Sequence, residues 1–185
     1  VPFLLRALLV RGIILRKRPE KSAAAYAKIW TDEGSPLIVL SKRMHQKVEK
    51  LVDVPVALSM RYGTMTILKG LQELHDKGVD EVMLFALYPQ HAMASTVTIW
   101  ELAEELRKKH FPEMAFTIVP AFYNKPDYIK ALSNSIKRQL DTFEYDHLLF
   151  SYHGIPERHI RKTDITKSHC KINGSCCNTP SPAHE

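Results

Sequence analysis

The sequence has few cysteines. There are three, Cys170, Cys176 and Cys177, and all of them lie near the C-terminal end. Small secreted proteins that cannot build a large core depend on disulfides distributed along the chain. With 185 residues, of which 45% are hydrophobic and 25% charged, this chain is long enough to bury a core without them. A disulfide framework is therefore not expected.

Motifs that would assign several common function classes are also absent. The sequence has no Gly-rich phosphate loop, so a nucleotide is not the expected ligand. It has no G-x-S-x-G nucleophile elbow, which argues against a hydrolase of that type. It has neither an arginine-rich arm nor alternating aromatic and basic residues, so nucleic acid is the weakest candidate partner. The formal net charge of +6 favours an acidic lipid or a carboxylated small molecule instead.

Residues 2–18 form an apolar stretch that arginines interrupt. The stretch is too short to span a bilayer, and it lacks the continuous apolar core of a signal peptide. At helical spacing its leucines and isoleucines share one face with basic side chains at the border, which predicts an amphipathic helix. The pattern alone favours a helix packed on its own domain over one that lies on an anionic membrane or beside a hydrophobic pocket.

The rest of the chain, as far as Tyr152, alternates between helical and strand patterns of apolar residues. From Gly154 to Glu185 the sequence shows neither a helical nor a strand period. Repeated βα units predict an α/β fold with a parallel sheet and helices on both faces. Thr64 is expected to cap the helix that follows it, and Gly78 to end that helix. Helices are expected over 35–52, 64–77, 94–110 and 126–143, and strands over 54–60, 79–87, 115–120 and 147–152.

Three of the expected strands end in side chains that can bind or react with a ligand. Arg61 and Tyr62 follow one strand, Tyr88 follows the next, and His153 follows the last. The carboxyl ends of parallel strands lie on one edge of a sheet, where open α/β sheets bind ligands. An arginine pairs with carboxylates, tyrosines offer flat faces to an aromatic ligand, and an imidazole accepts a proton near neutral pH or binds a metal. Each residue also has an interpretation without a ligand. Arg61 could form a surface ion pair, Tyr62 and Tyr88 could simply end their strands, and His153 could be a structural histidine.

Residues 148–158, Leu-Leu-Phe-Ser-Tyr-His-Gly-Ile-Pro-Glu-Arg, resemble the signature of ferrochelatase, the enzyme that inserts ferrous iron into a porphyrin. Other stretches resemble elements of the same family, in the same order, and the resemblance covers the chain up to about Asp164. The further matches are Gly-Ser-Pro-Leu at 34–37, Met-Arg-Tyr-Gly at 60–63, Leu-Tyr-Pro-Gln at 87–90 and Tyr-Asn-Lys-Pro-Asp-Tyr at 123–128.

The resemblance implies a chelatase-like fold of two similar Rossmann-like lobes with a porphyrin cleft between them. Residues 1–145 would form the first lobe without its first strand, and residues 146–185 would begin the second lobe, including a cysteine-rich loop at 165–185. The chain would then be a fragment, which its start at Val1 and its end within a Pro-rich run also indicate. The helix at 2–18 would be the apolar lip that borders the porphyrin mouth and touches the membrane. The resemblance thus favours a membrane or pocket contact over a helix packed on its own domain.

The activity implied is that of a lyase that inserts ferrous iron into protoporphyrin IX, the terminal step of haem biosynthesis, in the cytoplasm and in contact with the membrane. His153 would take a pyrrole proton or bind the iron, and both roles stay open. Arg61, Tyr62 and Tyr88 would hold the porphyrin or line the path of the metal. In the family a glutamate of the second lobe faces the histidine, and its position lies beyond Glu185, so the segment alone is expected to be inactive.

Two other functions remain open at this point. One is a related chelatase that loads cobalt or nickel into a different tetrapyrrole. The other is a tetrapyrrole-binding or metal-binding module without catalytic activity. A glutamate opposite His153 in the rest of the protein would favour an enzyme over a binding module.

The cysteine spacing, Cys170-x5-Cys176-Cys177, resembles that of bacterial ferrochelatases with a [2Fe–2S] cluster on an internal loop. Such a cluster takes four cysteine ligands, so the fourth would lie beyond Glu185. A zinc site that includes His169 and a loop with free cysteines are the alternatives. The long aperiodic stretch favours a bound cluster, because something must order that segment.

The chain departs from the family pattern at two places. After Gln90 the family usually has an aromatic residue and then a serine, whereas this chain has His91 and Ala92. A role that depends on that serine hydroxyl is therefore not expected in this chain. Where the family signature continues to Gly-Asp, this chain has Thr163 and Asp164, so the turn must be made without glycine.

Overall fold

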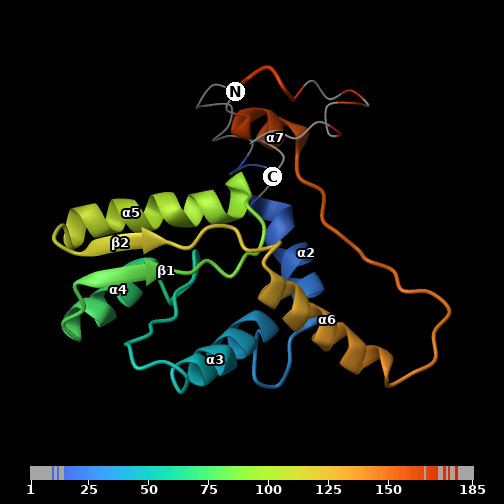
Figure 1. Ribbon diagram of the computed structural model, residues 1–185, viewed down its shortest axis with the longest axis horizontal. Coiled ribbons are helices and arrows are strands. Elements are labelled where there is room, and N and C mark those ends of the chain that lie inside the picture. The colour runs from blue at the N-terminus through green and yellow to red at the C-terminus, as the bar shows by residue number, and fades with distance from the viewer. Residues whose placement is uncertain are drawn as a thin grey trace. The chain divides into compact units, whose positions relative to one another are not determined.

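The chain forms two compact units, Val1–Lys77 and Gly78–Glu185, and each is described by itself. The prediction of an amphipathic helix at 2–18 lies largely outside the described residues. Every helix in the described part of the chain is too short or too polar to cross a bilayer. The computed structural model, shown in Figure 1, describes residues 10, 12, 15–164, 166–170, 173, 175 and 178.

The described part of the first unit is built from helices. Helix α3 begins with proline at its first position, where a missing N–H leaves no hydrogen bond unmade. Gly34, two residues earlier, turns the chain into the helix with φ of +107°, a left-handed geometry that glycine adopts without strain. Both helices that the sequence predicts in this region are present in slightly shorter form. The helices are α2 (Leu15–Ala27), α3 (Pro36–Val48) and α4 (Ile67–Asp76).

Helix α4 buries the apolar side chains of one face. The hydroxyl of Thr66 accepts a hydrogen bond from the Lys69 N–H at 3.3 Å. The predicted cap at Thr64 is therefore wrong, because Thr66 is the extended residue that directly precedes the first helical turn. Gly78 follows the end of the helix with φ of +78°, as predicted. The buried apolar side chains of α4 are Ile67, Leu71 and Leu74.

The strand predicted over 54–60 does not form. Its last residue, Met60, makes one bridge to Thr66, and its other residues join no ladder. The imidazole Nε2 of His45 donates to the Val56 carbonyl at 3.1 Å, so a side chain of α3 holds this segment extended. A valine-rich run becomes a strand only where a neighbouring strand supplies hydrogen bonds, and no described strand pairs with this one.

The second unit contains a βαβ arrangement. Strands β1 and β2 are parallel and in register from Glu81 opposite Ala115 to Leu84 opposite Ile118. The connection between them runs through α5, which lies along the sheet in Figure 1. The predicted α/β fold with a parallel sheet is therefore confirmed. The elements are β1 (Glu81–Leu84), η2 (Met93–Val97), α5 (Thr98–His110), β2 (Ala115–Ile118), α6 (Pro126–Leu140) and α7 (Glu157–Thr163).

Some elements of the second unit differ from those expected. In β1, Val82 is buried and Met83 is 68% exposed, so this strand is covered on one face rather than on both. The helix expected from residue 94 begins with the π-helical turn η2. Helix α7 lies in a stretch where no period was recognised, because seven residues are too few to show one.

The strand predicted over 147–152 is also wrong. The segment is extended but unpaired, and Leu149 and Tyr152 are 88% and 81% exposed. The run is apolar enough for a buried strand, yet no strand among the described residues lies beside it to complete a ladder.

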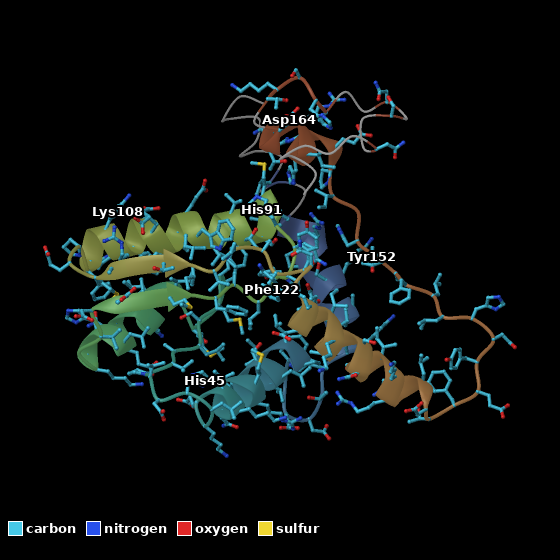
Figure 2. The ribbon with its side chains drawn as sticks, viewed as in Figure 1. His45, His91, Lys108, Phe122, Tyr152 and Asp164 are labelled. Atoms are coloured by element: carbon cyan, nitrogen blue, oxygen red, sulfur yellow. The ribbon has the colours of Figure 1, made fainter. Side chains whose placement is uncertain are left out.

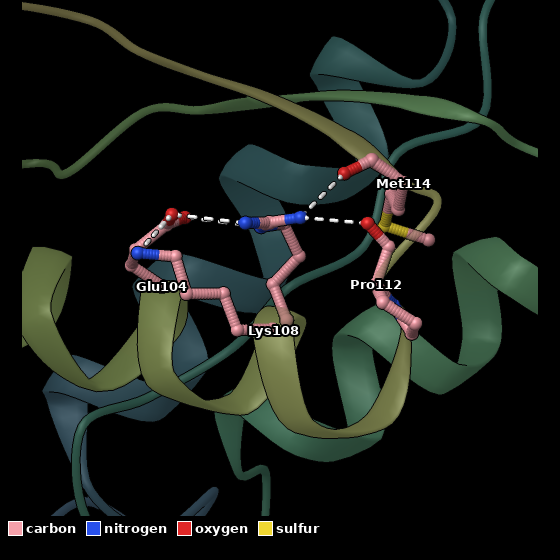
Figure 3. Close-up of polar contacts among 5 residues, drawn as sticks. Glu104, Lys108, Pro112 and Met114 are labelled. Atoms are coloured by element: carbon pink, nitrogen blue, oxygen red, sulfur yellow. Dashed lines mark hydrogen bonds and ion pairs between the residues drawn. The ribbon is translucent and has the colours of Figure 1, made fainter.

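Hydrogen bonds from Arg107 hold the turn between α5 and β2 (Figure 3). Its guanidinium donates to the carbonyls of Pro112 and Met114 at 3.0 and 3.2 Å, and its other nitrogens donate to Glu104 at 3.1 and 3.0 Å. Lys108 also approaches Glu104, at 3.2 Å. The hydrogen bond from Arg107 lowers the pKa of the Glu104 carboxyl. These contacts hold the turn that leads from α5 into β2.

Candidate functional site

The loops that follow β1 and β2 are joined to each other at the carboxyl edge of the sheet. The N–H groups of Phe122 and Tyr123 both donate to the Pro89 carbonyl, at 2.9 and 3.0 Å. Nearer the strands, the Val119 N–H donates to the Leu84 carbonyl at 3.0 Å. The edge at which α/β sheets bind ligands is thus formed by two loops that hold each other in place.

Aromatic rings gather on these loops. Phe122 stacks on Phe85 with ring centroids 5.0 Å apart, and meets the edge of Tyr128 at 5.3 Å. His91 lies 5.4 Å from Trp100 of α5. Figure 2 labels His91 and Phe122, one on each loop. Aromatic pairs of this kind contribute about 0.5–1.5 kcal/mol each beyond their burial, so the edge has a rigid apolar surface.

Tyr88 belongs to this edge. It is half exposed, and its N–H donates to the Ala86 carbonyl at 2.8 Å, which turns the chain directly after β1. The structure therefore brings Tyr88 together with His91 and Phe122 on neighbouring loops of one unit. The sequence identified Tyr88 but not Phe122 or Trp100, because an isolated aromatic residue in a loop or helix carries no periodic signal.

Arg61 and Tyr62 lie in the first unit, on the turn that the bridge between Met60 and Thr66 closes. The Arg61 guanidinium carbon is 4.9 Å from the centre of the Tyr62 ring, a cation–π contact. The Nε of Arg61 is buried and has no hydrogen-bond partner within the described part of the chain. A buried guanidinium N–H without a partner is costly, and an anionic group is the kind of partner that would satisfy it.

His153 lies on the exposed, extended segment that precedes α7. Within the described residues it makes no hydrogen bond, ion pair or ring contact. Gly154 and Pro156 follow it, and α7 begins at Glu157. The structure therefore places His153 where a solute can reach it, but brings it into contact with none of the other candidate residues.

Asp164 organises the loop after α7. It is 3% exposed, and its carboxylate accepts hydrogen bonds from the Thr166 N–H and hydroxyl at 3.0 and 2.6 Å. The N–H groups of His169 and Cys170 donate to its second oxygen, both at 2.9 Å. The Thr166 hydroxyl, followed by the Cys170 N–H, lowers the pKa of Asp164 from 3.8 to about 2. The turn without glycine is thus closed by a side chain, and Lys167 takes the left-handed position with φ of 55°.

The substitution Asp164→Asn is expected to loosen this loop. An amide offers one oxygen in place of two, and its NH₂ group faces N–H donors. The amide hydrogens of His169 and Cys170 should then exchange faster with solvent, as measured by hydrogen–deuterium exchange. Because the pKa of Asp164 is lowered in the folded protein, the carboxylate stabilises the loop above about pH 4, and this stabilisation is lost as the pH falls toward 2. Asp146→Asn, at an exposed aspartate outside this loop, is the control, and equal exchange in both variants would contradict this role.

Cys170 is the one candidate cluster ligand within the described residues, and it is half-buried. Cys176 and Cys177 lie outside the described residues, and so does the pattern predicted for them. Among the described residues, no group of three or more histidine, cysteine or acidic side chains could hold a metal ion.

Comparison with known proteins identifies the family. The profile of the family Ferrochelatase matches residues 1–177. The ferrochelatase of Ectopseudomonas mendocina (strain ymp) is 46% identical over 184 residues, which are 99% of this chain and 53% of that protein. The ferrochelatase of Opitutus terrae (strain DSM 11246 / JCM 15787 / PB90-1) is 41% identical over 181 residues, 97% of this chain and 52% of that protein. The chain spans about half the length of the curated relatives it matches, and it belongs to the ferrochelatase family.

Proposed function

We propose that the whole protein inserts ferrous iron into protoporphyrin IX and so forms protohaem, the terminal step of haem biosynthesis. The observation that carries this proposal is 46% identity to a ferrochelatase across 99% of the chain, including the signature around His153. The reaction class is that of a lyase acting on a tetrapyrrole. Ferrous iron is a substrate here and not a resident cofactor.

The proposed role of His153 follows from the chemistry of metallation. Two pyrrole N–H protons must leave the macrocycle, and the iron must lose its water ligands. A neutral imidazole either accepts such a proton or binds the metal during transfer. The exposure of His153 supports both roles, because neither the proton nor the metal has to displace a protein partner.

Arg61, Tyr62 and Tyr88 are proposed to bind the porphyrin or to line the path of the metal. The unpartnered Nε of Arg61 supports a contact with a carboxylate, and protoporphyrin carries two. Tyr62 is 77% exposed and lies against the Arg61 guanidinium, so a planar ligand could meet the cation and the phenol together. Tyr88 lies on the loop whose Pro89 carbonyl binds the loop of Phe122, and Phe122 stacks on Phe85. Such an apolar aromatic surface is suited to a macrocycle.

The rest of the protein is proposed to complete this site. In this proposal residues 1–145 belong to a first lobe and residues 146–185 begin a second, which supplies a carboxylate opposite His153. The apolar and unpaired segment 147–152 supports the proposal, because a buried strand beside it would satisfy its backbone and cover its side chains.

Three further properties belong to this proposal: a cluster, a location in the cell and a contact with the membrane. A [2Fe–2S] cluster held by Cys170, Cys176, Cys177 and a fourth cysteine is supported by the spacing and by the Asp164 hydrogen bonds that order the loop at Cys170. Peripheral contact of residues 2–18 with a membrane is supported by the amphipathic pattern of that segment. Cytoplasmic location is proposed because the family resemblance implies it.

A substrate panel tests the proposed function against the related chelatases. The full-length protein is supplied anaerobically with protoporphyrin IX or with a reduced tetrapyrrole, each with ferrous iron, cobalt or nickel. We expect the highest kcat/KM for the pair of ferrous iron and protoporphyrin. A preference for a reduced tetrapyrrole with cobalt or nickel would contradict the proposal, and so would the binding of every tetrapyrrole without metallation.

A further inference from the structure

Thr96 has an unusual position beneath the loop that carries Tyr88. It is 1% exposed, although it is polar. Its hydroxyl accepts a hydrogen bond from the Ala92 N–H at 2.9 Å and donates one to the Ala92 carbonyl, also at 2.9 Å. One side chain thus satisfies both backbone groups of a single residue four positions earlier.

These bonds replace an ordinary helix cap. Ala92 is the extended residue that precedes η2, and its methyl side chain cannot accept a hydrogen bond from the first helical turn. In a capping box, a side chain inside the helix reaches back to the N–H of the cap residue. Thr96 makes the corresponding bond from the fourth helical position. The hydroxyl that fixes this turn therefore comes from the helix and not from residue 92.

The turn itself is of a rare kind. The Val97 N–H donates to the Ala92 carbonyl at 3.3 Å, five residues back, which is the π-helical pattern. Single π-helical turns occur frequently at functional sites. Here the turn joins α5 to the loop with Tyr88 and His91, so the position of Ala92 sets where that loop leaves the carboxyl edge of the sheet.

We propose that Thr96 is a positioning residue for porphyrin binding, which acts by holding Ala92 and, through it, the loop that carries Tyr88 and His91. The inference rests on the proposed function for the identity of the ligand. Its structural part, that the hydroxyl fixes the loop, stands on the burial of Thr96 and on its two hydrogen bonds.

The test compares variants of the full-length protein that differ at this hydroxyl. Thr96→Val keeps the shape and removes both hydrogen bonds, whereas Thr96→Ser keeps the hydroxyl. We expect Thr96→Val to raise the KM for protoporphyrin about tenfold with a smaller change in kcat, and Thr96→Ser to restore the wild-type value. Thr98→Val is the matched control, because the Thr98 hydroxyl bonds to the Ser95 carbonyl and not to Ala92.

A second measurement is independent of activity. The amide hydrogen of Ala92 should exchange faster with solvent in Thr96→Val, and as slowly as in the wild type in Thr96→Ser and Thr98→Val. Should Thr96→Val not fold, Thr96→Ala removes the same hydroxyl without new bulk, and the same two results are expected.

The outcomes separate the two proposals. An active wild type with equal KM in Thr96→Val and Thr98→Val would overturn the positioning role and leave the proposed function standing. Failure of the wild type to metallate protoporphyrin would refute the proposed function. Whatever the activity of the wild type, slow exchange of the Ala92 amide hydrogen in Thr96→Val would overturn the structural part of the inference.

Discussion

Replacing His153 by alanine in the full-length protein is expected to lower kcat for iron insertion by at least about a hundredfold, the effect typical of removing a general base. The loss should appear at every concentration of porphyrin, because the imidazole acts on the protons or the metal and not on the affinity for the macrocycle. Folding should be unaffected, since within the described residues His153 makes no hydrogen bond, ion pair or ring contact. Steady-state metallation followed by absorbance measures the change.

His147→Ala is the matched control. His147 lies on the same exposed segment, six residues before His153, and has no assigned role. Its replacement should leave kcat unchanged. If His153→Ala retains most of the wild-type kcat, or if both variants lose activity equally, the catalytic assignment of His153 is wrong.

Replacing Arg61 by alanine is expected to raise the KM for protoporphyrin by about 10- to 150-fold, because a hydrogen bond to a charged group contributes about 1.5–3 kcal/mol. Arg61→Lys should recover part of the loss, since lysine keeps the charge but lacks the planar guanidinium and its Nε donor. The buried and unpartnered Nε of Arg61 is the basis of this expectation. Initial rates over a range of porphyrin concentrations separate the change in KM from any change in kcat.

Two controls make this prediction specific. Arg43→Ala removes an exposed arginine that pairs with Glu33, and it should leave KM unchanged. A porphyrin with esterified carboxylates should bind equally to the wild type and to Arg61→Ala, because the proposed partner of the guanidinium is gone. A KM for protoporphyrin that Arg61→Ala does not change would remove Arg61 from the proposed binding site.

The helices could be predicted from the sequence because their signals are local. Proline at the start of α3, glycine after α4 and apolar spacing within each helix act over a few residues, and the predicted helices appear with small shifts at their ends. The parallel pair β1 and β2 could also be predicted, since a helix of suitable length separates the two strand patterns.

The other two strands could not be predicted correctly, because a strand depends on a partner distant in sequence. Residues 54–60 and 147–152 have the composition of strands, but no described strand lies beside them. The same reason separates the candidate residues that followed these strands. The sequence places Arg61, Tyr88 and His153 on one predicted sheet edge, whereas in the structure Tyr88 alone follows a paired strand.

The polar contacts that shape the site were not predictable either. The side chains of Thr96 and Asp164 form hydrogen bonds with backbone groups a few residues away. Such bonds leave no trace in the pattern of apolar residues from which the elements were predicted. The departures from the family pattern at Ala92 and Thr163 were the available signals. At each place a side chain fixes the backbone of the turn: Thr96, four positions after Ala92, and Asp164, the residue directly after Thr163.

The central claim is that this chain belongs to a protein that makes haem. It is tested by incubating the full-length protein anaerobically with ferrous iron and protoporphyrin IX and measuring protohaem by its absorbance over time. We expect repeated turnovers, and a rate with His153→Ala that is at least about a hundredfold lower. Porphyrin that remains metal-free with the wild-type protein, or metallation no faster than without protein, would contradict the account.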